Sequence, residues 1–361
     1  MSNSHPLVSV IVPSYNAAGW LPGLCRSLQA QTFRDFEVLI GDDGSTDNTR
    51  EVLAPFLADA RFQIISWKPN RGMTAGWLTL LERVRGEFYC TMAADDEWEP
   101  TFLECRLAVM QEHPQVVLAH GRTRLIDESG QPLGDRPEYV EQTALHRGLY
   151  DRLDRLPAIL SGAEALPLLL QHNVIGATSL MIRTAASRRL GNHLRFGWIY
   201  ATDWSHWLLH LAADGDLAYD ARPLALYRVH GGSLTCSPSK EAMRDSERRL
   251  VPLWALGTAA KFSMYAGDLW TRWRGPLYGL WLRRAAKLAR AGQLNDAWLQ
   301  AGALAFYGPG RSRVNLWTEL ARHSVGLGLH TMREAAARRR QFCVVSGLAL
   351  IEHPFYRGTA E

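Results

Sequence analysis

The chain has 361 residues, a formal net charge of +4 and 47% hydrophobic residues, which is the size and composition of a folded globular protein. Every apolar run is shorter than the roughly 18 residues that a membrane-spanning helix needs, so the sequence predicts no transmembrane helix. The start of the chain has no basic segment before its apolar run, and the five cysteines are scattered without CxxC or zinc spacing. We therefore expect no signal peptide and reduced thiols in a cytoplasmic protein.

Basic residues are concentrated in the C-terminal third of the chain. Residues 240–361 contain 19 Lys and Arg against 9 Asp and Glu, whereas residues 1–239 contain 21 against 27. A basic surface of this kind can bind an anionic partner such as a membrane, and equally it can be a solvated face. This charge balance predicts that residues 240–361 form a different, more basic kind of surface than residues 1–239.

Strand and helix patterns alternate along the first hundred residues. Strands that alternate with helices imply right-handed crossovers and a parallel sheet. The sequence therefore predicts an α/β fold, with a Rossmann-like and mostly parallel sheet flanked by helices. The predicted strands are 7–12, 36–40, 62–66 and 87–92, and the clearest predicted helices are 19–31 and 73–84.

Two of the predicted strands end in a pair of acids, Asp42-Asp43 and Asp95-Asp96. The carboxyl ends of parallel strands share one edge of a sheet, and ligands bind at that edge in open α/β sheets. Adjacent carboxylates repel unless they are protonated, hydrogen-bonded or bound to a cation, and Mg²⁺ and Mn²⁺ prefer such oxygen ligands. A bare Asp-Asp pair is also common in solvated loops and helix caps. Since no GxGxxG motif or Walker lysine follows these strands, the dinucleotide and P-loop interpretations lose their usual support.

Four segments in the right order carry a resemblance to a known family. The run VSVIVPSYNAAGWLPGLCRSLQAQTFRDFEVLIGDDGSTDNT resembles the opening of the family 2 glycosyltransferases, inverting enzymes with nucleotide-sugar donors and the GT-A fold. The agreement covers residues 7–100 and resumes over about 176–235, with GATSLMIR and then ATDWSHWLLHLAADGDLAYDARPLALYRVHGGSLT. The resemblance implies a GT-A catalytic domain over 1–236, with a nucleotide-sugar half (1–119) and an acceptor-side half (120–236).

The resemblance also implies which residues hold the donor. Pro13 and Tyr15 are expected around the nucleobase, and Asp43 matches the acid that accepts from the base N3–H. A carboxylate bonded to an imide N–H prefers a uracil- or thymine-type base over adenine, although Asp43 could merely close a turn. Where many members carry an Arg-Asn pair near the donor phosphates, this chain has Trp77-Leu78. Arg71 could supply that charge, or it could be an ordinary exposed arginine.

For a metal the family uses Asp-x-Asp, and here the first acid of that motif is replaced by Ala93. The resemblance points to Asp95 as the ligand of Mn²⁺ or Mg²⁺, with Asp96 as a candidate where the first acid is missing. His230, in the closing segment YRVHGGS, matches a histidine that can reach the metal or the diphosphate. A lone histidine is more commonly structural, so both interpretations of His230 stay open.

Thr202-Asp203-Trp204 matches a Glu-Asp-aromatic motif at the head of a helix, whose second acid serves as the general base. The resemblance therefore makes Asp203 the predicted catalytic base, with Thr202 in place of the glutamate. The alternative is an acid at a helix start that the helix dipole favours.

Residues 237–361 are predicted to form a helical, basic and Trp-rich C-terminal region. Helical spacing over 277–291 and 293–306, broken at Gly292, predicts an αα-hairpin. Such a layer would suit docking on an anionic inner leaflet, or it could pack on the catalytic domain with a solvated basic face.

Together these features predict an inverting glycosyltransferase that moves a sugar from a nucleotide diphosphate sugar, most simply UDP-linked, to a hydroxyl of a glycan or lipid-linked glycan. We expect it to be cytoplasmic, with docking on the inner face of the membrane as an option, and to bind no nucleic acid. The alternatives are a nucleotidyltransferase and a catalytically silent protein that binds sugar nucleotides. The donor sugar and the acceptor do not follow from the motifs, because one fold serves many substrates.

Overall fold

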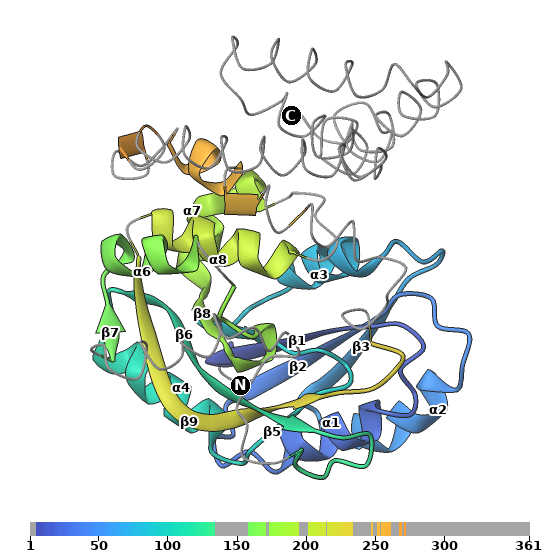
Figure 1. Ribbon diagram of the computed structural model, residues 1–361. Coiled ribbons are helices and arrows are strands. Elements are labelled where there is room, and N and C mark those ends of the chain that lie inside the picture. Colours follow the sequence, from blue (N-terminus) through green and yellow to red (C-terminus); the bar gives the residue numbers. More distant parts are fainter. Residues whose placement is uncertain are drawn as a thin grey trace, which may run out of the picture. The chain divides into compact units, whose positions relative to one another are not determined.

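A computed structural model of the protein (Figure 1) describes residues 5–133, 158–170, 173–194, 201–213 and 215–233, with short pieces between 247 and 271. The chain divides into two compact units, Met1–Leu194 with His210–Cys236, and Arg195–Leu209 with Ser237–Glu361. The β-sheet belongs to the first unit. The predicted domains, 1–236 and 237–361, remain a prediction, because the predicted hairpin over 277–306 and most of the basic region lie outside the described residues.

The first half of the sheet is parallel, as the alternating pattern predicts. Its strands stand in the order β3-β2-β1-β4, and β1 pairs in parallel with both β2 and β4. Helices connect these strands, so all four carboxyl ends meet at one edge. The elements are β1 (Val8–Ser14), α1 (Leu21–Gln29), β2 (Phe36–Asp42), α2 (Thr49–Leu53), η1 (Ala54–Ala58), β3 (Phe62–Ser66), α3 (Met73–Leu81) and β4 (Phe88–Thr91).

The predicted Rossmann-like sheet flanked by helices is confirmed, and the complete sheet is mixed. Within the described residues nine strands pair in the order β3-β2-β1-β4-β8-β6-β9-β5, with β7 beside β9. The short strand β8 runs antiparallel between β4 and β6, whereas β6 and β9 pair in parallel. The strand-helix alternation that implies parallel crossovers ends at β4. The further strands are β5 (Glu97–Trp98), β6 (Val116–Ile126), β7 (Ile159–Leu160), β8 (Met181–Arg183) and β9 (Asp216–Arg228).

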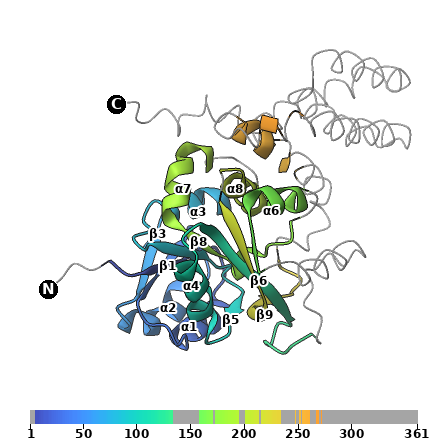
Figure 2. The same cartoon turned by 90° about the vertical axis from the view of Figure 1, so that its left-hand side faces the viewer.

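Helices cover both faces of the sheet in the first unit (Figures 1 and 2). Helices α1 and α4 lie on one face, and α3, α6 and α7 lie on the other. The remaining helical elements are α4 (Phe102–Glu112), α6 (Gly162–Leu169), η2 (Ala177–Ser179), α7 (Thr184–Leu190), η3 (Gly191–Leu194) and α8 (Thr202–Ala212). No helix of the described residues is long and apolar enough to cross a membrane.

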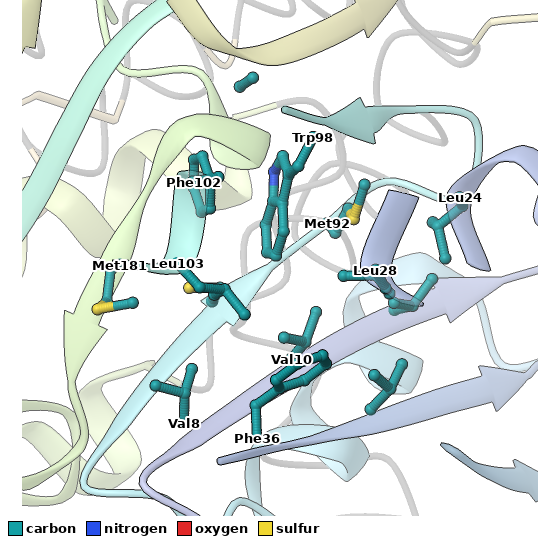
Figure 3. Close-up of a cluster of buried hydrophobic side chains, with 14 of the residues drawn as sticks. Val8, Val10, Leu24, Leu28, Phe36, Met92, Trp98, Phe102, Leu103 and Met181 are labelled. Carbon is teal, nitrogen blue, oxygen red and sulfur yellow. The ribbon is translucent and has the colours of Figure 1, made fainter. Parts of the chain in front are cut away.

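The main core fills the space between the sheet and the helices α1 and α4 (Figure 3). Alternate residues of β1, Val8, Val10 and Val12, point to this face because successive side chains of a strand point to opposite sides. The rings of Trp98 and Phe102 stack with centroids 4.0 Å apart. Trp98 lies two residues after Asp96, in β5, so this core anchors the segment that carries the acidic pair after β4.

We predict that Phe102→Ala lowers the free energy of unfolding by about 3–5 kcal/mol, because it removes a large buried ring and leaves a cavity. Phe102 is 0% exposed. The matched control is Leu57→Ala on η1, whose side chain is 45% exposed, and which should change stability by no more than about 0.5 kcal/mol. Chemical denaturation followed by circular dichroism measures both. Equal effects of the two substitutions would contradict the assignment of the core.

Candidate active site

The loops after β1 and β2 are tied to each other by hydrogen bonds. Ser14 and Asp42 are register partners at the ends of these strands, and the Asp43 N–H donates to the Ser14 carbonyl at 2.9 Å. The Asn16 N–H donates to Ser45 Oγ at 2.9 Å, and Asn16 adopts a left-handed φ of 50°. These bonds fix the turn around Tyr15, which is 50% exposed. Pro13, one residue before the end of β1, is half-buried.

Asp43 is the most tightly held acid at this edge. Its side chain is buried, and among the described residues three N–H groups donate to it. The Trp67 indole N–H and the Arg71 backbone N–H donate to Oδ1 at 2.5 and 2.7 Å, and the Gly72 N–H donates to Oδ2 at 2.8 Å. Asp43 thus organises the 67–72 loop, and its bond to a nucleobase stays a prediction. The Arg71 side chain itself is exposed, with its guanidinium 5.6 Å from the Trp67 ring.

Asp95 and His230 come together at the end of β4. His230 Nε2 lies 2.9 Å from Asp95 Oδ2, and the histidine ring lies 4.8 Å from the ring of Trp20. The Asp95 side chain is 26% exposed and that of His230 is 9% exposed. The pair combines a carboxylate and an imidazole, both of which ligate divalent cations.

Asp96 has a different environment from its neighbour. It is 1% exposed, its Oδ1 accepts from the Arg228 N–H at 2.9 Å, and its Oδ2 bonds to the Thr178 hydroxyl. Burial, followed by the charge of Asp95, raises the pKa of Asp96 well above its ordinary value. Because Asp96 is almost completely buried and bonded on both sides inside the protein, this arrangement favours it as an anchor of the segment, and its role as a metal ligand stays a prediction.

Arg228, at the end of β9, is the residue of this site that the sequence did not single out. Its guanidinium is buried and donates to the carbonyls of Asp95 (2.8 Å), Asp127 (2.8 Å) and Glu128 (3.2 Å), and it pairs with Glu97. It thereby joins the acidic segment after β4 to the turn after β6. That turn closes through a hydrogen bond from the Gly130 N–H to the Asp127 carbonyl. The sequence offered no sign that Arg228 reaches it.

Asp203 is the second residue of α8. One face of that helix is buried, and it carries Trp204, Trp207, Leu208 and Leu211. Asp203 belongs to the second unit, whereas Asp43, Asp95 and His230 belong to the first. Its role as general base therefore stays a prediction.

Comparisons with known proteins find similar sequences and similar folds. Residues 9–165 match the family model described as glycosyl transferase family 2. A putative teichuronic acid biosynthesis glycosyltransferase, TuaG of Bacillus subtilis, is 29% identical over 247 residues, 68% of this chain and 87% of that protein. The UDP-Glc:alpha-D-GlcNAc-diphosphoundecaprenol beta-1,3-glucosyltransferase WfgD of Escherichia coli is 30% identical over 123 residues, which span 34% of this chain and 48% of that protein.

Solved structures show the same fold at low sequence identity. Residues 1–349 of S. aureus TarS in complex with UDP-GlcNAc give a TM-score of 0.55 at 16% identity, covering 84% of this chain and 82% of that chain. The mannosyltransferase PcManGT of Pyrobaculum calidifontis, in complex with GDP-Man and Mn²⁺, gives a TM-score of 0.50 at 16% identity. The match covers 96% of this chain and 87% of that chain.

The sheet of the first unit, with its acidic carboxyl edge, and the match over residues 9–165 define the class of protein. Residues 9–165 form a domain of glycosyltransferase family 2, and the chain has the GT-A fold. The resemblance that its motifs indicated is thereby confirmed, and the chain is a glycosyltransferase.

We predict that Arg228→Gln lowers the free energy of unfolding by about 3 kcal/mol, because it leaves the partly buried Glu97 and several carbonyls without their donor. The matched control is Arg222→Gln on the same strand, since Arg222 pairs with Asp220 but is 60% exposed. The control should cost less than about 1 kcal/mol. Urea titration of both variants checks this, and similar midpoints would contradict the clamping role of Arg228.

Proposed function

We propose that the protein is an inverting transferase that moves a sugar from a uridine diphosphate sugar to a hydroxyl of a glycan or lipid-linked glycan. One observation carries the proposal: the loop of Tyr15, the carboxylate of Asp43 and the Asp95–His230 pair follow three neighbouring parallel strands, β1, β2 and β4. They therefore share the carboxyl edge of the sheet, where α/β folds bind their ligands.

The nucleoside would bind between the loop of Tyr15 and Asp43. Three donors orient Asp43, and Oδ2 accepts only one of them among the described residues, from the Gly72 N–H. A carboxylate oxygen can accept two hydrogen bonds, so Oδ2 can still take the N3–H of a uracil ring. The exposed Tyr15 ring, with Pro13 behind it in β1, supplies an apolar surface beside the base. The exposed guanidinium of Arg71 is free to turn toward the donor phosphates.

The residues at the end of β4 fit a divalent cation bound together with the donor. No cluster of three or more His, Cys, Asp or Glu placed for a metal occurs in the described part of the chain. Asp95 and His230 would therefore hold Mn²⁺ or Mg²⁺ as a pair, and the diphosphate and water would complete its coordination. A bound cation supplies positive charge that stabilises the leaving diphosphate.

The proton of the acceptor hydroxyl needs a base, and we assign this role to Asp203. Its carboxylate would take the proton while the acceptor oxygen attacks the anomeric carbon from the face opposite the diphosphate, which inverts the configuration. The proposal is supported by the position of Asp203 at the head of α8 in the motif Thr202-Asp203-Trp204.

The relatives suggest where such an acceptor would be found. WfgD is named for a diphosphoundecaprenol-linked acceptor and TuaG for teichuronic acid biosynthesis. We propose a lipid-linked or polysaccharide acceptor of the cell envelope and therefore a protein that works at the inner face of the membrane. The basic balance of residues 240–361 would favour such a surface.

We predict that chelation by EDTA abolishes sugar transfer and that Mn²⁺ or Mg²⁺ restores it. Asp95→Ala should raise the metal concentration needed for half-maximal donor binding by tenfold or more, in the range of about 10- to 100-fold that metal-site substitutions cost. Asp96→Ala should act mainly on the free energy of unfolding, because its side chain is 1% exposed and bonded inside the protein, whereas that of Asp95 is 26% exposed. Titration of donor binding at several Mn²⁺ concentrations separates the two. Full activity in chelator would contradict the metal requirement. A larger effect of Asp96→Ala than of Asp95→Ala on metal affinity would make Asp96 the metal ligand.

We predict that Asp203→Asn lowers turnover by roughly 10²–10⁴-fold, the usual contribution of a general base, with nearly unchanged donor affinity. The matched control is Glu51→Gln, which removes an exposed acid from the first turn of α2 and should cost only about 0.3–1 kcal/mol of stability. Transfer rates and donor binding are measured for both variants. A wild-type transfer rate in Asp203→Asn would reduce this residue to a helix-start acid.

A further inference from the structure

The hydrogen-bond donors around Asp43 are divided unequally between its two carboxylate oxygens. An ionised carboxylate offers about four acceptor positions, two on each oxygen. The Trp67 indole N–H and the Arg71 N–H take both positions on Oδ1, and the Gly72 N–H takes one on Oδ2. Since no other described residue donates to Asp43, one acceptor position stays open.

We propose that Trp67 is a specificity-determining residue, which makes Asp43 accept a single N–H from the donor base and so selects uracil over guanine. The inference rests on the proposed placement of the base beside Asp43. Uracil presents one imide N–H between two carbonyls, which matches one open acceptor position. Guanine presents its ring N–H and its exocyclic amine side by side, and this pair fits a carboxylate with one free position on each oxygen. Cytosine presents an unprotonated ring nitrogen at the same place and cannot donate from it.

The structure holds the indole of Trp67 in one place. Its side chain is 8% exposed and lies against the backbones of two glycines on neighbouring elements. A Cβ on Gly41 of β2 would lie 2.7 Å from Trp67 Cη2, and a Cβ on Gly76 of α3 would lie 3.0 Å from Cζ2. Both distances are shorter than ordinary carbon contacts, so the ring fills a slot that exists only because these residues lack side chains.

The test compares nucleotide affinities of the whole chain by isothermal titration calorimetry, with UDP, GDP and ribose 5-phosphate as ligands. Trp67→Phe keeps the aromatic filling but removes the N–H. We expect the preference for UDP over GDP to fall by about fivefold or more, the low end of what one unsatisfied buried donor costs. Affinity for ribose 5-phosphate, which has no base, should stay unchanged because it makes no contact that depends on the indole.

The matched control is Trp77→Phe. Trp77 is also buried, at 7% exposure, and its indole N–H donates to Thr91 Oγ at 3.1 Å instead of to Asp43. It should leave the UDP to GDP ratio at the wild-type value. Gly76→Ala is a second test that keeps the indole N–H but displaces the ring, and it should lower the ratio in the same direction.

The outcomes separate this inference from the proposed function. If the wild-type protein prefers UDP and both Trp67→Phe and Gly76→Ala keep that preference in a folded state, Trp67 does not determine specificity. An equal loss of affinity for all three ligands would reduce Trp67 to a structural residue. If the wild-type protein shows no preference for UDP, the proposed uridine donor fails first, and the assignment of Trp67 fails with it.

Discussion

The candidate site depends on the parallel pairing of β1 with β2 on one side and β4 on the other. Parallel neighbours end at the same edge, so the strand pairing brings together three loops that are distant in sequence. The register partners Ser14 and Asp42 show how closely the ends align. The core beneath this edge, with Val10 on β1 and the Trp98–Phe102 stack, prevents the strands from shifting, because a slip by one residue would turn buried side chains toward solvent.

Hydrogen bonds of buried polar groups then fix the conformation of each loop. Asp43 organises the 67–72 loop through three donors, and Arg228 joins the segment of Asp95 to the turn after β6. Burying such groups is costly unless each finds its partners, so each network specifies one arrangement of its loop. In the first place the bonds hold the side chain of Asp43, and in the second they hold the backbone carbonyl of Asp95. The pre-organisation that transfer chemistry needs is therefore built into the loops.

The parallel half of the sheet could be predicted from the sequence. The strands β1 to β4 follow from local apolar runs, and their parallel order follows from the helices between them. The antiparallel β8 could not be predicted, because three residues carry no periodic signal and its partners, β4 and β6, are far away in sequence. Asp96 and Arg228 show the same limit for the site, since their roles arise from contacts across more than 130 residues. A motif identifies which acid is present but not which of its oxygens remain open.

The claim that this edge of the sheet is a uridine nucleotide site can be tested by photolabelling. A 5-azidouridine diphosphate sugar would be irradiated with the protein, and the labelled peptides would be identified by mass spectrometry, with excess UDP as competitor. The account predicts that UDP-sensitive label falls on the peptides that contain Tyr15 and the 67–72 loop, which flank Asp43 in the structure. Label confined to peptides elsewhere in the chain, or label that UDP does not displace, would contradict it.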